Sequence, residues 1–80
     1  MMPIEYKKNM AVFSDVVSVE EAEGLLEWLQ SKPAAKLHLA ACTHLHPANL
    51  QVMMAVKVRI IAWPDDVDLR AWLETALKSE

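Results

Sequence analysis

Three side chains that could bind a metal ion or take part in catalysis lie close together in the segment ACTHLHPANLQVMM. They are Cys42, His44 and His46. Alternate side chains of an extended strand point to the same face, so we expect these three to point the same way. Three nitrogen and sulfur ligands on one face could form a zinc site with an open fourth position. A small metal-binding protein that uses Cys42, His44 and His46 is therefore one hypothesis.

Nucleophilic catalysis has less support from the sequence. A cysteine nucleophile needs a base within hydrogen-bond reach and a third group that orients the base. Cys42 is the single cysteine and is the last residue of an apolar strand, where a cysteine is more often a small buried hydrophobic residue. The single glycine, Gly24, falls in the middle of a predicted helix, which excludes a glycine-rich phosphate-binding loop. We expect no enzymatic activity and no cofactor.

The composition favours one small domain in a reducing compartment. The chain has 80 residues and a net charge of −3, which provides no basic surface for nucleic acid. One cysteine cannot form an intrachain disulfide. The longest apolar run covers residues 52–56, far fewer than the roughly 20 that span a bilayer, and the N-terminal residues do not form a signal peptide. We expect residues 1–80 to form one cytoplasmic domain with neither a nucleic-acid nor a membrane partner.

Hydrophobic periodicity predicts the first half of the fold. Two β-prone runs, residues 4–6 and 10–14, flank Lys7-Lys8-Asn9 and indicate a hairpin. Ser18 and Glu21 are spaced as a capping box, which predicts the start of a helix that ends before Pro33.

The second half alternates strands and helices. An apolar strand over residues 36–42 is expected to be covered on both faces. A helix over 47–57 follows, with His46 as its N-cap and Pro47 at its first position. A second buried strand is predicted over 58–63, and Asp65 or Asp66 is expected to cap a last helix. The order β-β-α-β-α-β-α predicts an α/β domain with parallel crossovers, a small mixed sheet of four or five strands, and three helices.

Three segments together carry a resemblance to a known family. Residues 37–42 form an apolar strand, His46-Pro47-Ala48-Asn49 form a turn, and residues 49–54 begin a helix. This layout resembles the STAS domain of anti-sigma-factor antagonists, in which a strand, an Asp-Ser-x-Gly turn and a Gly-Leu-x-x-Leu-Leu helix follow one another. The segment VSVEEAEGLLEWL is similar to the approach to the family's first helix, and the similarity extends over residues 10–77.

The resemblance implies a non-catalytic protein-interaction module in bacterial signalling or regulation. In the family, a partner kinase phosphorylates the turn serine, and the phosphate disrupts partner binding. Pro47 stands at that position and has no hydroxyl group, so we expect an adaptor that retains the recognition geometry without the phosphorylation switch. The partner would be a kinase, an anti-sigma factor or another signalling protein. The expected partner-binding residues are His44, His46, Pro47, Ala48, Asn49, Val52 and Val56.

A surplus of apolar residues suggests where a partner or a second copy could bind. Apolar residues make up 54% of the chain, a high fraction for so small a domain. If Leu50, Met53 and Met54 face the sheet, the opposite side of the helix carries an exposed apolar stripe, which usually marks an interface. The stripe consists of Ala48, Val52, Ala55 and Val56. We expect this stripe to form a homodimer or partner interface unless a neighbouring helix covers it. A purely structural subunit of a larger complex is a third hypothesis.

Overall fold

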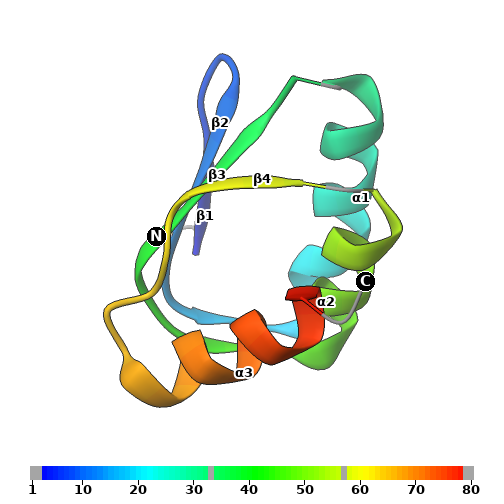
Figure 1. Ribbon diagram of the computed structural model, residues 1–80. Coiled ribbons are helices and arrows are strands. Elements are labelled where there is room, and N and C mark those ends of the chain that lie inside the picture. Colours follow the sequence, from blue (N-terminus) through cyan, green and yellow to red (C-terminus); the bar gives the residue numbers. More distant parts are fainter. Residues whose placement is uncertain (1–2, 33, 57, 79–80) are drawn as a thin grey trace.

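The computed structural model describes residues 3–32, 34–56 and 58–78. Within these ranges the chain forms four strands and three helices in the order β-β-α-β-α-β-α (Figure 1). The strands are β1 (Ile4–Tyr6), β2 (Met10–Val17), β3 (Lys36–Leu45) and β4 (Arg59–Ala62). The helices are α1 (Ala22–Ser31), α2 (Pro47–Ala55) and α3 (Val67–Lys78), and a short 3-10 helix, η1 (Val19–Glu21), precedes α1. The predicted α/β class and element order are confirmed.

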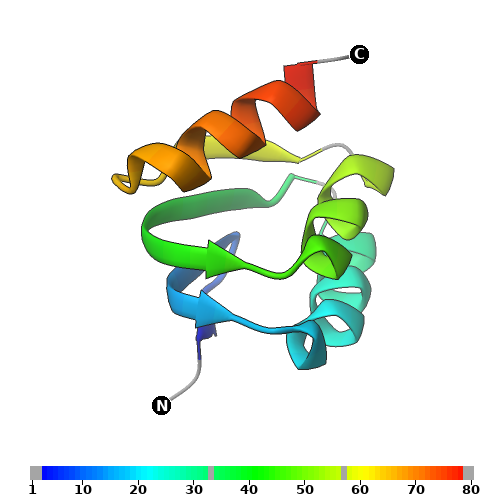
Figure 2. The ribbon, with the colours of Figure 1, turned by 90° about the horizontal axis from the view of Figure 1, so that it is seen from below.

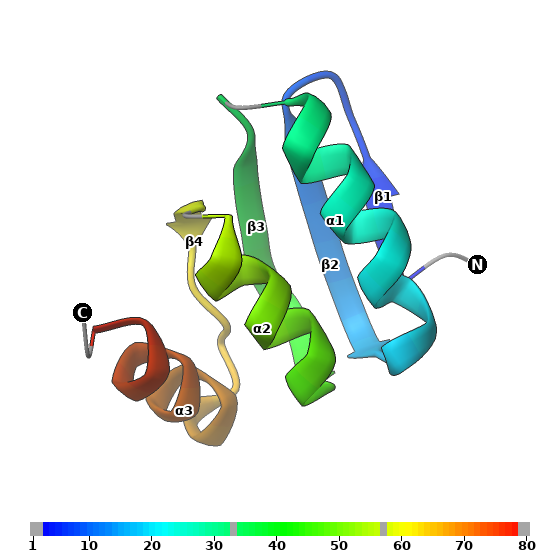
Figure 3. The same ribbon diagram turned by 90° about the vertical axis from the view of Figure 1, so that its right-hand side faces the viewer.

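The four strands form one mixed sheet in the order β1-β2-β3-β4. β1 and β2 are antiparallel and form the predicted hairpin, closed by a 2.7 Å bond from the Lys7 N–H to the Met10 carbonyl. β2, β3 and β4 are parallel, as the alternation of strands and helices predicted. When parallel strands follow one another in chain order across a sheet, connections of the same hand place their helices on the same face of that sheet. α1 and α2 accordingly lie side by side on the same face of the sheet (Figures 2 and 3).

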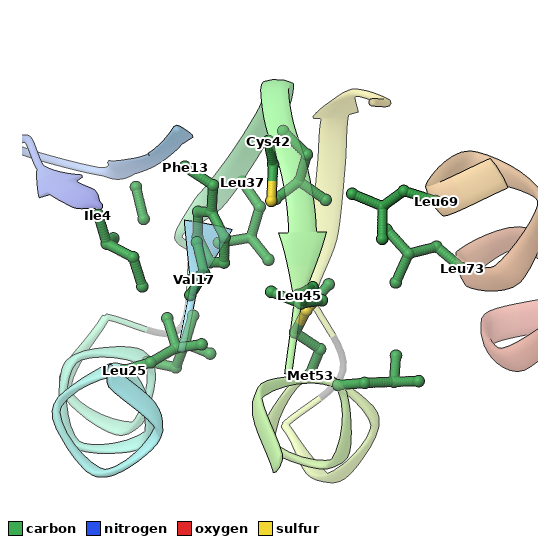
Figure 4. Packing of buried hydrophobic residues seen from close by; sticks show 14 of the residues in the cluster. Ile4, Phe13, Val17, Leu25, Leu37, Cys42, Leu45, Met53, Leu69 and Leu73 are labelled. Atoms are coloured by element: carbon green, nitrogen blue, oxygen red, sulfur yellow. The ribbon is translucent and has the colours of Figure 1, made fainter. Parts of the chain in front are cut away.

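The hydrophobic core lies between this face of the sheet and the helices (Figure 4). Phe13 and Leu37 reach it from the central strands, Leu25 from α1 and Met53 from α2. Leu73 of α3 is fully buried and points toward the carboxyl half of β3. In the part of the chain that the structure describes, no helix is both long and apolar enough to cross a membrane.

The expectation that β3 is covered on both faces is wrong. Leu37 and Leu39 are buried, whereas His38 and Ala40 between them are partly exposed. The described helices that pack on the sheet occupy one face, so β3 alternates between a buried and an open face like a strand covered on one side.

β3 also contains two extra residues relative to β2. Val12 of β2 is opposite His38, but Ser14 is opposite Ala41, so β3 has one extra residue in this interval. The second extra residue lies between Cys42 and His44, which are opposite two consecutive residues of β2. An extra residue in a strand shifts the alternation of all side chains that follow. As a result, Leu39, Cys42 and Leu45 are all buried although they are spaced by three residues.

β4 is a short edge strand, not the buried strand predicted over residues 58–63. It pairs only with Lys36, Leu37 and His38 at the start of β3, and Ile61 is 48% exposed. Beyond these pairs the chain leaves the sheet, and the Asp65 N–H donates to the Ala40 carbonyl at 3.2 Å. The position of β4 at the end of the strand order explains its exposure, because one of its edges has no neighbouring strand.

The predicted caps at the starts of the first and last helices have different outcomes. Ser18 makes no side-chain capping bond, because the chain after it begins with η1, where the Glu21 N–H donates to the Ser18 carbonyl at 3.1 Å. The predicted capping box is therefore wrong. At α3, the Asp66 carboxylate accepts a bond from the Leu69 N–H at 2.9 Å, which confirms the predicted cap.

Candidate functional site

A groove of about 430 Å³ lies where the carboxyl end of β3 meets the first turns of α2 and α3. In parallel β-α units the carboxyl ends of the strands and the starts of the following helices meet at one edge of the sheet, where ligands commonly bind. Leu45 and Leu69 are buried at the groove, and Trp72 is 38% exposed. The lining residues are Thr43, His44, Leu45, Pro47, Asp66, Asp68, Leu69 and Trp72.

His46 and Pro47 fix the start of α2 beside this groove. The His46 Nδ1 atom accepts a 3.0 Å bond from the Ala48 N–H, and Pro47 takes the first helical position. Both features confirm the predicted helix start. Because a ring nitrogen must be unprotonated to accept a hydrogen bond, this cap requires a neutral imidazole with its proton on the other nitrogen.

Removing the His46 cap should weaken α2 without unfolding the protein. We expect His46→Ala to lower the free energy of unfolding by about 1 kcal/mol, because the Ala48 N–H loses its acceptor. His46→Asp should restore the cap and add a favourable charge at the helix N-terminus. Urea denaturation monitored by circular dichroism measures both changes. An alanine variant as stable as the wild type would show that water replaces the cap at no cost.

Asn49, one of the expected partner-binding residues, is not available to a partner in this structure. Its side chain is completely buried, and its Nδ2 atom donates to the Ser18 carbonyl at 2.8 Å and to the Val17 carbonyl at 3.5 Å. The Oδ1 atom is buried as well and has no hydrogen-bond partner. The Asn49 amide therefore ties the first turn of α2 to the junction of β2 and η1, and its role is to hold the groove's scaffold together.

Cys42, His44 and His46 do not converge on a metal site. The extra residue between Cys42 and His44 places the cysteine in the core and leaves the histidine exposed, so the expected common face is wrong. The Cys42 thiol donates to the His44 carbonyl at 3.4 Å, and the His46 Nδ1 atom is occupied by its cap. Among the described residues, no group of three histidine, cysteine or acidic side chains is placed to hold a metal ion.

The environment of Cys42 also opposes thiolate chemistry. The pKa of the thiol is raised from about 9 to about 11, and burial is the largest cause. A hydrogen bond with the His44 backbone lowers the pKa, and the negative charges of Asp15 and Asp66 raise it, within this net value. The thiol is therefore protonated at neutral pH, and a protonated thiol is neither a good nucleophile nor a good metal ligand.

The raised pKa of Cys42 makes stability depend on pH in alkaline solution. The folded protein keeps this proton up to about pH 11, whereas the unfolded chain loses it near pH 9. The unfolded state then binds fewer protons, so stability should fall as the pH rises through this window. Because burial also raises the pKa of Tyr6, the comparison needs a matched variant. Between pH 8 and 11 we expect urea denaturation to show a loss about 1–2 kcal/mol larger for the wild type than for Cys42→Ala. Equal losses would contradict the raised pKa.

The two valines of the apolar stripe expected on α2 are covered within the monomer. Val52 and Val56 are half-buried and pack against the core, on the side of the helix that also carries Asn49. Leu50 and Met53 face the sheet as expected, but Met54 is 43% exposed. Four of the six large hydrophobic residues that are exposed in the described ranges lie instead at the carboxyl edge of the sheet: Val16, Val19, Val67 and Trp72.

Two of the expected partner-binding residues, His44 and Pro47, line the groove. The α3 wall, which Asp68, Leu69 and Trp72 provide, was not predicted from the sequence. The predicted start of α3 could have identified this wall. A helix that follows a parallel strand begins at the carboxyl edge of the sheet, which is also where the turn before α2 lies.

No family model, curated protein or solved structure matches this chain. The functional inference below therefore depends on the residues of the groove and on the sequence resemblance described above.

Proposed function

We propose that the protein is a non-catalytic interaction module that binds a protein partner at the groove. The observation that carries this proposal is Trp72, which is 38% exposed on the wall of a groove whose other apolar residues, Leu45 and Leu69, are buried. Tryptophan is highly buried on average, and it is one of the residues enriched at the energetic centres of protein interfaces.

The surrounding surface supports the same site. Val16 is 54% exposed and is paired with the lining residue His44 across β2 and β3. Val67 begins α3 between two lining residues and is 78% exposed. Exposed apolar side chains gathered at one edge usually mark an interface, whereas single ones are ordinary.

The sequence resemblance supports an adaptor of the STAS type in bacterial signalling or regulation. It assigns partner contact to the turn before α2, and Pro47 of that turn is exposed on the groove. No serine lies in this turn, so the proposed adaptor binds its partner without a serine phosphorylation switch. The proposed partner is a kinase, an anti-sigma factor or another signalling protein, and a second copy of the chain is the alternative.

A capture experiment with matched variants tests the proposal. Wild-type protein, Trp72→Ala and Met54→Ala are immobilised and exposed to a lysate of the source organism, and bound proteins are identified by mass spectrometry. We expect a partner that the wild type and Met54→Ala retain and Trp72→Ala loses, because Met54 is exposed on α2 but does not line the groove. Light scattering of the same three proteins measures self-association. A partner, or a dimer, that persists in Trp72→Ala would place the interface elsewhere.

A further inference from the structure

The groove carries a charge as well as apolar surface. Its lining includes two carboxylates, Asp66 and Asp68, and no lysine or arginine. The only ion pair among the described residues joins Arg70 to Glu74, outside this lining. Asp15 and Asp66 also lie close enough to the buried Cys42 thiol to raise its pKa.

The helix termini offset only part of this charge. α2 and α3 both begin at the groove, and each helix N-terminus is equivalent to about half a positive charge, so the two together contribute about +1. Two carboxylates contribute about −2, which leaves a net charge of about −1. The balance therefore favours a single cation over an anion.

The shape and chemistry of the lining favour arginine as that cation. The Trp72 side chain lines the groove and is 38% exposed, and a guanidinium group can stack on an aromatic ring as well as bind carboxylates through paired N–H groups. The Asp68 side chain is exposed at the start of α3 and is not used as a helix cap, whereas Asp66 already accepts from the Leu69 N–H. A cavity of about 430 Å³ is large enough for one long side chain and part of its peptide.

We infer that the groove binds an arginine side chain on a segment of the partner protein, with the guanidinium group between the Asp68 carboxylate and the Trp72 ring. Apolar residues beside that arginine would contact Leu45, Leu69 and Pro47. This inference rests on the proposed function and specifies the chemistry of the partner segment.

A peptide titration tests the inference directly. The probe is the blocked peptide acetyl-Ala-Leu-Arg-Leu-Ala-amide, and its binding to nitrogen-15-labelled protein is followed by amide and indole chemical shifts. We expect shifts at His44, Leu69 and Trp72, and binding about tenfold weaker for the peptide with citrulline, a neutral isostere, in place of arginine. Asp68→Asn should weaken binding of the arginine peptide about fivefold, and added salt should weaken it as well. Glu23→Gln removes one negative charge from the exposed face of α1 and should have no effect.

Several results would overturn the inference. Equal binding of the arginine and citrulline peptides, unchanged binding to Asp68→Asn, no binding of the arginine peptide, or shifts confined to another surface would each do so. The capture experiment separates this failure from failure of the proposed function. A partner that Trp72→Ala loses but Asp68→Asn and Asp68→Lys retain would support the interaction module and reject the arginine site.

Discussion

Asn49→Asp is expected to unfold the protein at neutral pH and to leave it folded near pH 4. The buried amide donates to two carbonyl oxygens, and a carboxylate in its place would present negative oxygens to the same carbonyls. Burying an unpaired charge costs several kcal/mol, while a domain of 80 residues has only about 4 to 12 kcal/mol of stability. The protonated acid can donate one of the lost bonds, so stability should return on acidification.

The direction of this pH dependence is set by burial. Burial would raise the pKa of the introduced carboxyl group in the folded state above its unfolded value of about 3.9. The folded state therefore holds the proton more tightly, and the stability it gains at low pH is lost as the pH rises through the folded-state pKa. Urea denaturation at pH 4 and pH 7 measures the effect. Gln51→Glu, on an exposed position of the same helix, provides the control with the same change in charge. If Asn49→Asp were as stable as the control at pH 7, the tie between α2 and β2 would contribute little.

Two neighbouring substitutions in α3 should separate stability from binding. Leu73 is fully buried, and we expect Leu73→Ala to lower the free energy of unfolding by about 2–5 kcal/mol through lost burial and a residual cavity. Trp72 is partly exposed, so Trp72→Ala should cost well under half as much while removing the proposed partner contact. Thermal denaturation and peptide titration of both variants measure the two effects. If Trp72→Ala proved the more destabilising of the two, the tryptophan would be a core residue and the proposed contact would lose its basis.

Local signals in the sequence were sufficient for the order of the elements. The hairpin around Lys8, the proline at the first position of α2 and a cap of α3 by Asp65 or Asp66 depend on neighbours close in the chain, and the structure confirms all three, with Asp66 as the cap. Parallel pairing of the last three strands followed from their alternation with helices. The fold class is recoverable from sequence because each of these features is local or topological.

The errors concern features that depend on distant strands. The bulges of β3 are defined by its pairing with β2, which no local pattern reveals, so a regular alternation predicts that Cys42 and His44 share a face. The exposure of Ile61 depends on the position of β4 at the edge of the sheet, which hydrophobicity does not reveal. Asn49 looked like a surface residue by type, and its burial depends on two carbonyl groups about thirty residues away.

The short pairing of β4 with β3 is expected to let one wall of the groove open locally. Among the described residues, three of β3 pair with β4 and seven pair with β2, and α3 is the next element after β4, the weaker of these attachments. Segments with few cooperative hydrogen bonds open at lower free energy than the global transition. We therefore expect amide protons of β4 and α3 to exchange with solvent sooner than those of the β2–β3 pair.

One wall of the groove would then belong to a unit that opens while the rest stays folded. A ligand that bridges β3 and α3 would slow that opening, and hydrogen exchange in α3 would report occupancy of the groove.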